Sequence, residues 1–305
     1  MDCKLISYEN IDKDKWDCLL VSSDQIESQY ASYWYISSVS NCWSAIVLGD
    51  YVAAFPFAHK KKGGYELVYQ PFFTRSFPLM GKINEAFIRY VFDYFQENFS
   101  YLDVNLLSEI NFPFLSVEKR VFQQLNLNQE YKLIKDSYSK NTKRFLKKNQ
   151  NIKIEKSYDL DLFMSLFKAM VGEKLNYKNE NYNALSSLIK EGLANECIDF
   201  LQVKFEGEVV GYGVFYFYKN VVNFLKGAVT NKGKNIGAMY VLINHIIEQN
   251  CNSDLVLDFG GSNITTVSNF YKKFGAKNVT YHNYSFDNLP KIIKQLKNIR
   301  AKILK

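Results

Sequence analysis

The residues best suited to chemistry lie near the end of the chain, in the stretch Asp258-Phe259-Gly260-Gly261-Ser262-Asn263. An apolar run over residues 255–257 predicts a strand that leads into this glycine-containing turn. A short helix predicted over residues 264–274 then ends at Gly275, a residue that commonly terminates helices. Strand, turn and helix in this order hold backbone amides and polar side chains beside a substrate. We therefore take this stretch as the first candidate for an active site.

The polar side chains of this stretch each allow two interpretations. Asp258, at the end of the strand, is suited to act as a base or orient one, or to cap the turn or pair with a lysine. Ser262 and Asn263 are suited to cap the following helix or to hydrogen-bond a substrate. Gly260 and Gly261 permit a positive φ or a close approach of the backbone.

Composition limits the class of protein. The 305 residues allow two domains of ordinary size, and 47% hydrophobic residues allow a sizeable core. The net charge of +7 favours an acidic partner such as phosphate, nucleotide or tRNA, or reflects solvated lysines alone. Five cysteines without a CxxC pair, and three histidines, predict no metal site and a reducing, cytoplasmic compartment. We expect no signal peptide, and no membrane span because no apolar run approaches ~20 residues.

The elements predicted from periodicity form two similar series. Each runs from helix through three antiparallel strands to a helix and a last strand. The first half has predicted helices at 13–22, 29–38 and 84–97, and strands at 4–8, 43–48, 51–59, 65–69 and 101–106. The second half has predicted helices at 160–176, 182–194 and 236–249, and strands at 200–205, 209–218, 221–226 and 254–259. Val52 aligns with Val209, and Asp103 with Asp258. We infer a tandem duplication, with domains 1–134 and 135–305.

A basic helix is predicted at the junction, over residues 139–149. Ser139 or Asn141 can cap its start. Its four cations within six residues are Lys143, Arg144, Lys147 and Lys148. Two interpretations stand beside each other: a solvated helix between domains, or a contact with phosphate or another polyanion.

Together these patterns resemble the GNAT N-acyltransferases, and two copies joined by a basic helix resemble the Fem-type peptidoglycan aminoacyltransferases and their acetyltransferase relatives. The resemblance rests on residues 138–148, 258–262 and 270–276, with 70–74 in the first half. It implies an α/β protein of two tandem GNAT-like domains, each a mixed, mostly antiparallel sheet flanked by helices. In that fold the last strand of the meander and the next parallel strand splay apart, and the acyl donor binds in the gap.

The resemblance also implies a place for the phosphates of coenzyme A, at the N-terminus of the helix that follows the meander. The residues that this assigns to the donor are Lys232, Gly233, Lys234, Asn235, Gly237 and Ala238. Met239 departs from the family pattern, which has a small residue at that position. The alternative is that the two glycines serve only the turn and the start of the helix, with the lysines solvated.

Catalytic roles follow from the same resemblance. Tyr271, four residues before Gly275, has the spacing of the GNAT tyrosine that gives a proton to the leaving group, although aromatic residues at helical spacing also suit a core. Lys272 matches a lysine of Fem-type relatives near the donor channel.

Three functions remain open from the sequence. The first is an N-acyltransferase that uses acyl-CoA as co-substrate and a small-molecule amine as acceptor. The second is a Fem-type peptidyltransferase that uses aminoacyl-tRNA and a peptidoglycan or saccharide precursor, although no extra helical insertion is apparent. The third is a non-catalytic fold used for binding. None of the three involves DNA.

Overall fold

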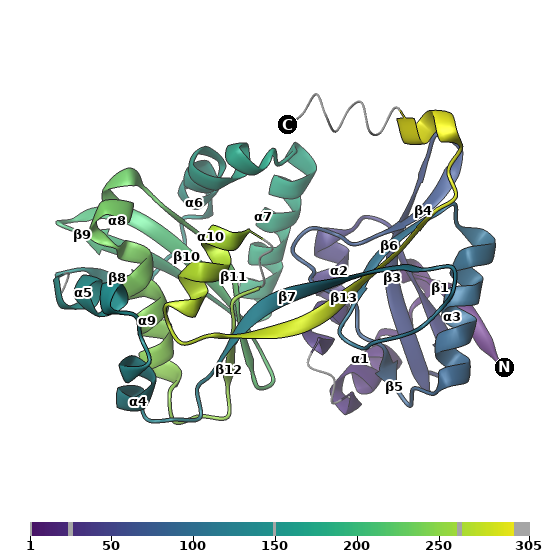
Figure 1. Cartoon of the computed structure of the whole chain (residues 1–305), viewed down its shortest axis with the longest axis horizontal. Helices are drawn as coiled ribbons and strands as arrows, with labels where there is room; N and C mark the ends of the chain where they lie inside the picture. Colours follow the sequence, from purple (N-terminus) through teal and green to yellow (C-terminus); the bar gives the residue numbers. More distant parts are fainter. Residues whose placement is uncertain (1, 24–26, 149–150, 261–263, 296–305) are drawn as a thin grey trace. The chain divides into compact units, whose positions relative to one another are not determined.

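The computed structural model describes residues 2–23, 27–148, 151–260 and 264–295, and shows an α/β protein (Figure 1). The chain divides into two compact units, which we call the first unit (1–119 with 281–305) and the second unit (120–280). The predicted architecture of mixed, mostly antiparallel sheets flanked by helices is confirmed. The unit boundaries fall inside strands β7 (Ser116–Asn126) and β13 (Lys277–Asp287), whereas the predicted boundary lay after residue 134.

The sheet of the second unit contains the predicted meander. Its strands lie in the order β8, β9, β10, β11, β12 and β7. The bounds are β8 Lys153–Lys156, β9 Ile198–Phe205, β10 Glu208–Tyr218, β11 Val221–Val229 and β12 Val256–Asp258. All neighbours are antiparallel except β11 and β12. The hairpin turns have positive φ at Glu206, Gly207 and Lys219, as tight turns between antiparallel strands require.

Helices cover both faces of this sheet. On one face, the rings of Phe200 and Tyr212 pack against Phe163 of α6. On the other face, Phe215 and Phe224 belong to a core cluster that includes the buried residues of α9. Adjacent residues of a strand point to opposite faces, so each strand serves both layers. The helical segments are α4 Tyr131–Asp136, α5 Lys140–Lys148, α6 Leu160–Phe167, η3 Lys168–Gly172, η4 Glu173–Leu175, α7 Asn179–Ala194, α8 Asn231–Ile236, α9 Ala238–Asn250 and α10 Thr265–Lys272.

The first unit repeats this plan with the strand order β1, β2, β3, β4, β6 and β13, and β5 beside β3. Here β4 and β6 form the parallel pair. The elements are β1 Cys3–Ser7, α1 Lys13–Ser22, α2 Tyr33–Val39, β2 Trp43–Leu48, β3 Ala53–Lys62, β4 Tyr65–Tyr69, β5 Met80–Gly81, α3 Glu85–Asn98 and β6 Tyr101–Leu106. Pro56 lies between the parts of β3 that pair with β5 and β4, so its missing N–H breaks no ladder there.

Helix α3 buries a different face from the predicted one. The predicted face comprised Phe87, Tyr90, Val91 and Tyr94. The buried residues are Phe87, Val91, Phe92 and Phe95, while Tyr90 is exposed. The buried face of α3 is therefore rotated toward the phenylalanines, because a tyrosine hydroxyl finds hydrogen-bond partners in water more readily than in an apolar core.

Strand β7, from the first half of the sequence, completes the sheet of the second unit, and β13, from the second half, completes the sheet of the first unit. Strand β7 follows β6 in the chain but pairs with β12, and β13 follows β12 but pairs with β6. The repeat is visible in the register, since the parallel pairings end at Tyr69–Asp103 in one unit and Asn223–Asp258 in the other. The aligned aspartates thus hold equivalent places. Neither β7 nor β13 was among the predicted strands.

Candidate active site

The parallel strands β11 and β12 separate inside the second unit. Their pairing covers only Val221–Asn223 of β11 and ends at Asp258 of β12. Strand β11 runs on to Val229 without β12 beside it in the described part of the chain. Backbone groups on that edge are suited to accept an extended ligand by strand-like hydrogen bonds. This is the place where the resemblance to the GNAT fold puts the acyl donor.

A β-bulge lies at the point where the strands separate. Phe215 of β10 faces Phe224, whereas the preceding residue, Val214, faces Lys226, so Leu225 is the extra residue. Without the bulge, residues 224 and 226 would share a face. Because of it, Phe224 lies on the α9 face while Lys226, opposite Val214, lies on the α6 face. The bulge thus gives the gap a lysine on one side and an aromatic wall on the other.

Tyr271 lies at the same gap, on the aromatic side. Its ring stacks on Phe259 at 4.6 Å between centroids and meets Phe224 edge-on at 6.4 Å. Tyr271 therefore contacts β11 and the residue that directly follows β12. Burial, with a smaller contribution from the charge of Asp258, raises the pKa of Tyr271 well above that of a free tyrosine. The hydroxyl therefore stays protonated at neutral pH.

Asp258 stabilises the turn after β12. Its Oδ1 accepts a hydrogen bond from the Gly260 amide at 2.8 Å, and its side chain is fully buried. Gly260 has φ +75°, and a Cβ there would lie 3.2 Å from the Phe224 carbonyl oxygen. The turn-capping interpretation of Asp258 is thus observed, as is the close backbone approach at Gly260. Ser262, with Gly261 and Asn263, lies outside the described residues.

The expected donor loop forms a helix of its own, α8. The Thr230 side chain caps it by accepting a hydrogen bond from Gly233 N. Lys232 forms ion pairs with Glu206 at 3.2 Å and Glu208 at 2.9 Å, and the hydrogen bond to Glu208 raises its pKa. A Cβ on Gly233 would lie 2.3 Å from the Val210 carbonyl oxygen. These two residues serve the packing of α8 against β10 and its hairpin, which is the turn-and-packing alternative for the loop.

The start of α9 is covered by the basic helix. Gly237 has φ +75° and separates α8 from α9, where one helix beginning at residue 236 had been predicted. A Cβ on Gly237 would lie 2.4 Å from the ring of Phe145 in α5. Ala238 is buried, whereas Lys234 and Asn235 are exposed. Two of the six residues assigned to the donor phosphates, Lys234 and Asn235, are exposed and form no ion pair in the described part of the chain. Lys232 is also exposed, but it is paired with two carboxylates.

The basic helix α5 is docked, with its cations outward. The Ser139 hydroxyl caps it by accepting from Thr142 N, and Phe145 stacks on Tyr240 of α9 at 4.8 Å. The predicted cations are all exposed: Lys143, Arg144, Lys147 and Lys148. Lys143 donates to the Asp136 carbonyl oxygen at 2.9 Å, and Arg144 donates to Asn141 Oδ1 at 2.8 Å. In the described part of the chain none of the four is paired with a carboxylate.

Two further lysines were missed by sequence reasoning. Lys272 is exposed, but its neighbour Lys273 donates to the Tyr240 hydroxyl of α9 at 3.2 Å. Lys226 is half-buried on β11, and burial lowers its pKa to about 8. The signal for Lys226 was present, since a cation directly after the mostly apolar run Val-Val-Asn-Phe-Leu is out of place in a buried strand.

Comparison with known proteins agrees with this geometry. Residues 137–273 match the model of the family "Acetyltransferase (GNAT) domain". The crystal structure of FemX is similar, with TM-score 0.63 and 12% identity over 92% of this chain and 97% of that one. A conserved protein of unknown function from Bacteroides thetaiotaomicron gives TM-score 0.61 and 11% identity, over 90% and 97%. A tandem GNAT protein of the clavulanic acid biosynthesis pathway gives 0.56 and 9%, over 95% and 100%. No curated protein matched the sequence.

The chain therefore has a GNAT-superfamily fold of the tandem, FemABX-like type. The part that matches the acetyltransferase model contains the β11–β12 gap, the donor loop and Tyr271. In the described residues no helix combines the length and the apolar character that crossing a bilayer would require.

Proposed function

We propose that this protein is an N-acyltransferase whose acyl group arrives as an ester on tRNA and is transferred to an amine. The gap between β11 and β12, with Tyr271 on one side and Lys226 on the other, supports acyl transfer. The observation that carries the choice of carrier is α5, a docked helix whose outward cations have no carboxylate partners among the described residues. Such a row of cations suits a chain of phosphates.

The donor loop favours the same carrier. A pyrophosphate is usually held by free amides at the start of a helix. Here the loop residues form α8, and the Phe145 ring lies against Gly237 at the start of α9. The Phe145 ring thus covers the start of α9, and the cationic surface of α5 lies beside it. The resemblance to Fem-type aminoacyltransferases points the same way.

The proton chemistry also favours an ester. A free thiol has a pKa of about 8.5, so a thiolate is a weak base, whereas a ribose alkoxide is a stronger one. Tyr271, with its pKa raised by burial, gives up a proton more readily to an alkoxide than to a thiolate. Its environment is therefore better matched to the departure of a tRNA hydroxyl.

The proposed reaction uses two residues. The neutral amine attacks the ester carbonyl carbon, and a C–N bond forms in a tetrahedral intermediate. Lys226, in its neutral form, takes a proton from the new ammonium nitrogen, and Tyr271 gives a proton to the leaving oxygen as the C–O bond breaks. Proton transfer through water from the Lys226 ammonium to the Tyr271 phenolate restores both side chains. The products are an amide and a free tRNA hydroxyl.

Binding of tRNA to the full chain tests the carrier. We expect log affinity to fall linearly with log salt concentration, because bound cations are released from the RNA. Replacing Lys147 and Lys148 with Gln should lower the slope by about two, since each phosphate contact contributes about one. The matched control is the Lys61→Gln/Lys62→Gln pair on β3, which removes the same charge and should leave the slope unchanged. Equal slopes in both double variants would contradict a role for α5.

Acyl-CoA is the second candidate carrier, favoured by the match to the acetyltransferase family model. A ligand that binds the folded state raises the melting temperature. A rise in melting temperature with acetyl-CoA, together with salt-insensitive or absent tRNA binding, would mean that the carrier is CoA and not tRNA. Failure of both carriers to bind would instead support the non-catalytic use of the fold.

A further inference from the structure

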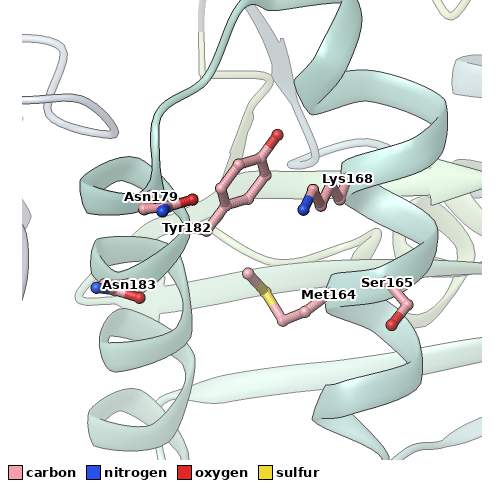
Figure 2. A pocket seen from close by; sticks show the side chains of 6 residues that line it. All are labelled: Met164, Ser165, Lys168, Asn179, Tyr182 and Asn183. Atoms are coloured by element: carbon pink, nitrogen blue, oxygen red, sulfur yellow. The ribbon is translucent and has the colours of Figure 1, made fainter.

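Two helix faces of the second unit form a small pocket on the α6 side of the sheet. Met164, Ser165 and Lys168 lie on one face of α6 and η3, at spacings of three and four residues. Asn179, Tyr182 and Asn183 lie on the facing side of α7 with the same spacing. The cavity has a volume of about 240 Å³. Figure 2 shows the Lys168 ammonium and the Met164 methyl group directed into the space between the helices, toward Tyr182.

The lining of the pocket is selective in its charge. It contains one cation, two carboxamides and two hydroxyls, and no acidic side chain. Lys168 has its Nζ 6.0 Å from the centre of the Tyr182 ring. In the described residues Lys168 forms no ion pair. A single ammonium with neutral hydrogen-bond donors suits a carboxylate, whereas a phosphate dianion usually requires more positive charge.

The apolar part of the pocket is closely packed. The Tyr182 ring lies against Gly172, where a Cβ would come within 2.3 Å of the Tyr182 hydroxyl. Phe167 and Tyr177 pack around the same ring at 6.5 and 6.1 Å between centroids. A short π-helical stretch, η3, supplies both Lys168 and Gly172 and contacts β11. Such π-helical turns are often found at functional sites.

We propose that this pocket binds a carboxylate carried by the amine acceptor, with Lys168 as its counter-ion and Met164 and Tyr182 against its aliphatic part. The proposal rests on the proposed function, and it names the acceptor class as an amino acid or a short peptide. The pocket lies on the same face of the sheet as Lys226 and beside the strand that carries it. Its volume is below the ~300 Å³ at which ligand sites usually begin, so it is suited to hold one end of an acceptor.

Direct binding to the full chain tests this site without any donor. The probes are 6-aminohexanoate and 6-aminohexanamide, in which a neutral carboxamide replaces the carboxylate, measured by saturation-transfer NMR and calorimetry. We expect the carboxylate to bind at least about tenfold more tightly than the amide. Lys168→Gln should abolish that preference, Lys168→Arg should keep part of it, and the control Lys174→Gln, an exposed lysine of η4, should leave it unchanged.

Three results would overturn the site: no saturable binding of 6-aminohexanoate, equal binding of the two probes, or an unchanged preference in a folded Lys168→Gln variant. The proposed function fails separately. If the carboxylate preference is present and depends on Lys168, but no donor supports acyl transfer, the pocket stands and the transferase reaction does not. If transfer occurs, Lys168→Gln should raise KM for carboxylate-bearing amines at least tenfold and leave kcat within about twofold.

Discussion

At the scale of single residues, Tyr271 and Tyr138 offer a matched pair. Both are buried and both contact the core around Phe274. Tyr271→Phe should lower the turnover number by roughly two to four orders of magnitude, the usual contribution of a general acid, with folding retained. Single-turnover kinetics with a saturating donor would measure this loss. Wild-type turnover in Tyr271→Phe would remove the residue from the mechanism.

Tyr138→Phe is the control for that experiment. The Tyr138 hydroxyl is buried and has no hydrogen-bond partner in the described structure. Removing it should leave activity unchanged and keep or slightly raise the melting temperature, because an unsatisfied buried polar group costs about 1–3 kcal/mol. A large loss of activity in this variant would show that core packing, rather than proton donation, explains the effect at Tyr271.

Lys226 gives a prediction about pH. Its folded-state pKa of about 8 lies below the usual 10.5, so the unfolded state binds more protons between these two values. Stability of the wild type should therefore rise with pH over this window. Below about pH 8 both states are protonated, and the cost of burying the charge is fully present. Lys226→Met should thus gain about 1–3 kcal/mol at pH 7, a gain that shrinks as pH approaches 10.5. Denaturant unfolding at several pH values measures it.

Removing Lys226 should lower activity, although it raises stability. If its neutral amine is the base, kcat/KM should rise with pH through a pKa near 8. Lys226→Gln should remove this limb and lower the rate by about 10²–10⁴. A variant that is slower at all pH values but keeps the limb would assign the titration to another group.

Individual residue roles were only partly predictable. The close backbone approach at Gly260 and the turn stabilised by Asp258 could be predicted, because a Gly-Gly-Ser pattern indicates a tight turn from the local sequence alone. The sequence marks Lys226 as a cation in a buried strand but does not give its face, because that face depends on the bulge at Leu225, which forms by pairing with β10. Likewise, the partners of Lys232 are carboxylates of a neighbouring hairpin, which no local pattern reveals.

At the scale of elements, the contact between α5 and the start of α9 is the feature to test. Gly237→Ala should destabilise the protein by about 2–4 kcal/mol, because it combines a positive φ with a clash against Phe145. The control is Gly207→Ala, which has φ +84° and no neighbouring atom within 4 Å, and should cost only about 1–2 kcal/mol. Urea midpoints of both variants give the comparison.

The clash can be isolated with a double variant. In a Phe145→Ala background, the additional cost of Gly237→Ala should fall to that of Gly207→Ala. An unchanged additional cost would mean that backbone strain alone accounts for the effect and that the ring does not hold α5 in place.

Regular elements with local signals were predicted well. Helix α1 has the predicted bounds, and the meander strands agree to within a few residues. Strands β7 and β13 were missed because their partners are distant in sequence, and β7 begins with the polar run Ser-Val-Glu-Lys-Arg. Helix α8 was missed because its glycine and lysines are typical of a loop.

At the scale of the whole molecule, the exchange of strands decides which fragments can fold. The predicted C-terminal domain, 135–305, lacks β7, which pairs with β12. We expect it to be insoluble or unfolded, with an open sheet edge. The fragment 120–280 contains the complete second unit and should unfold cooperatively by circular dichroism. Cooperative folding of both fragments would show that β7 is dispensable.

The pairing of β6 with β13 also determines when the sheet of the first unit can be completed during synthesis of the chain. Asn105 on β6 and its hydrogen-bond partner Asn283 on β13 are 178 residues apart. A ribosome that adds about 5–20 residues per second needs roughly 10–40 s to bridge that separation. During this interval β6 is an exposed sheet edge on a nascent protein, while the second unit is still emerging. The part of the polypeptide that is synthesised first is therefore the last to complete its sheet.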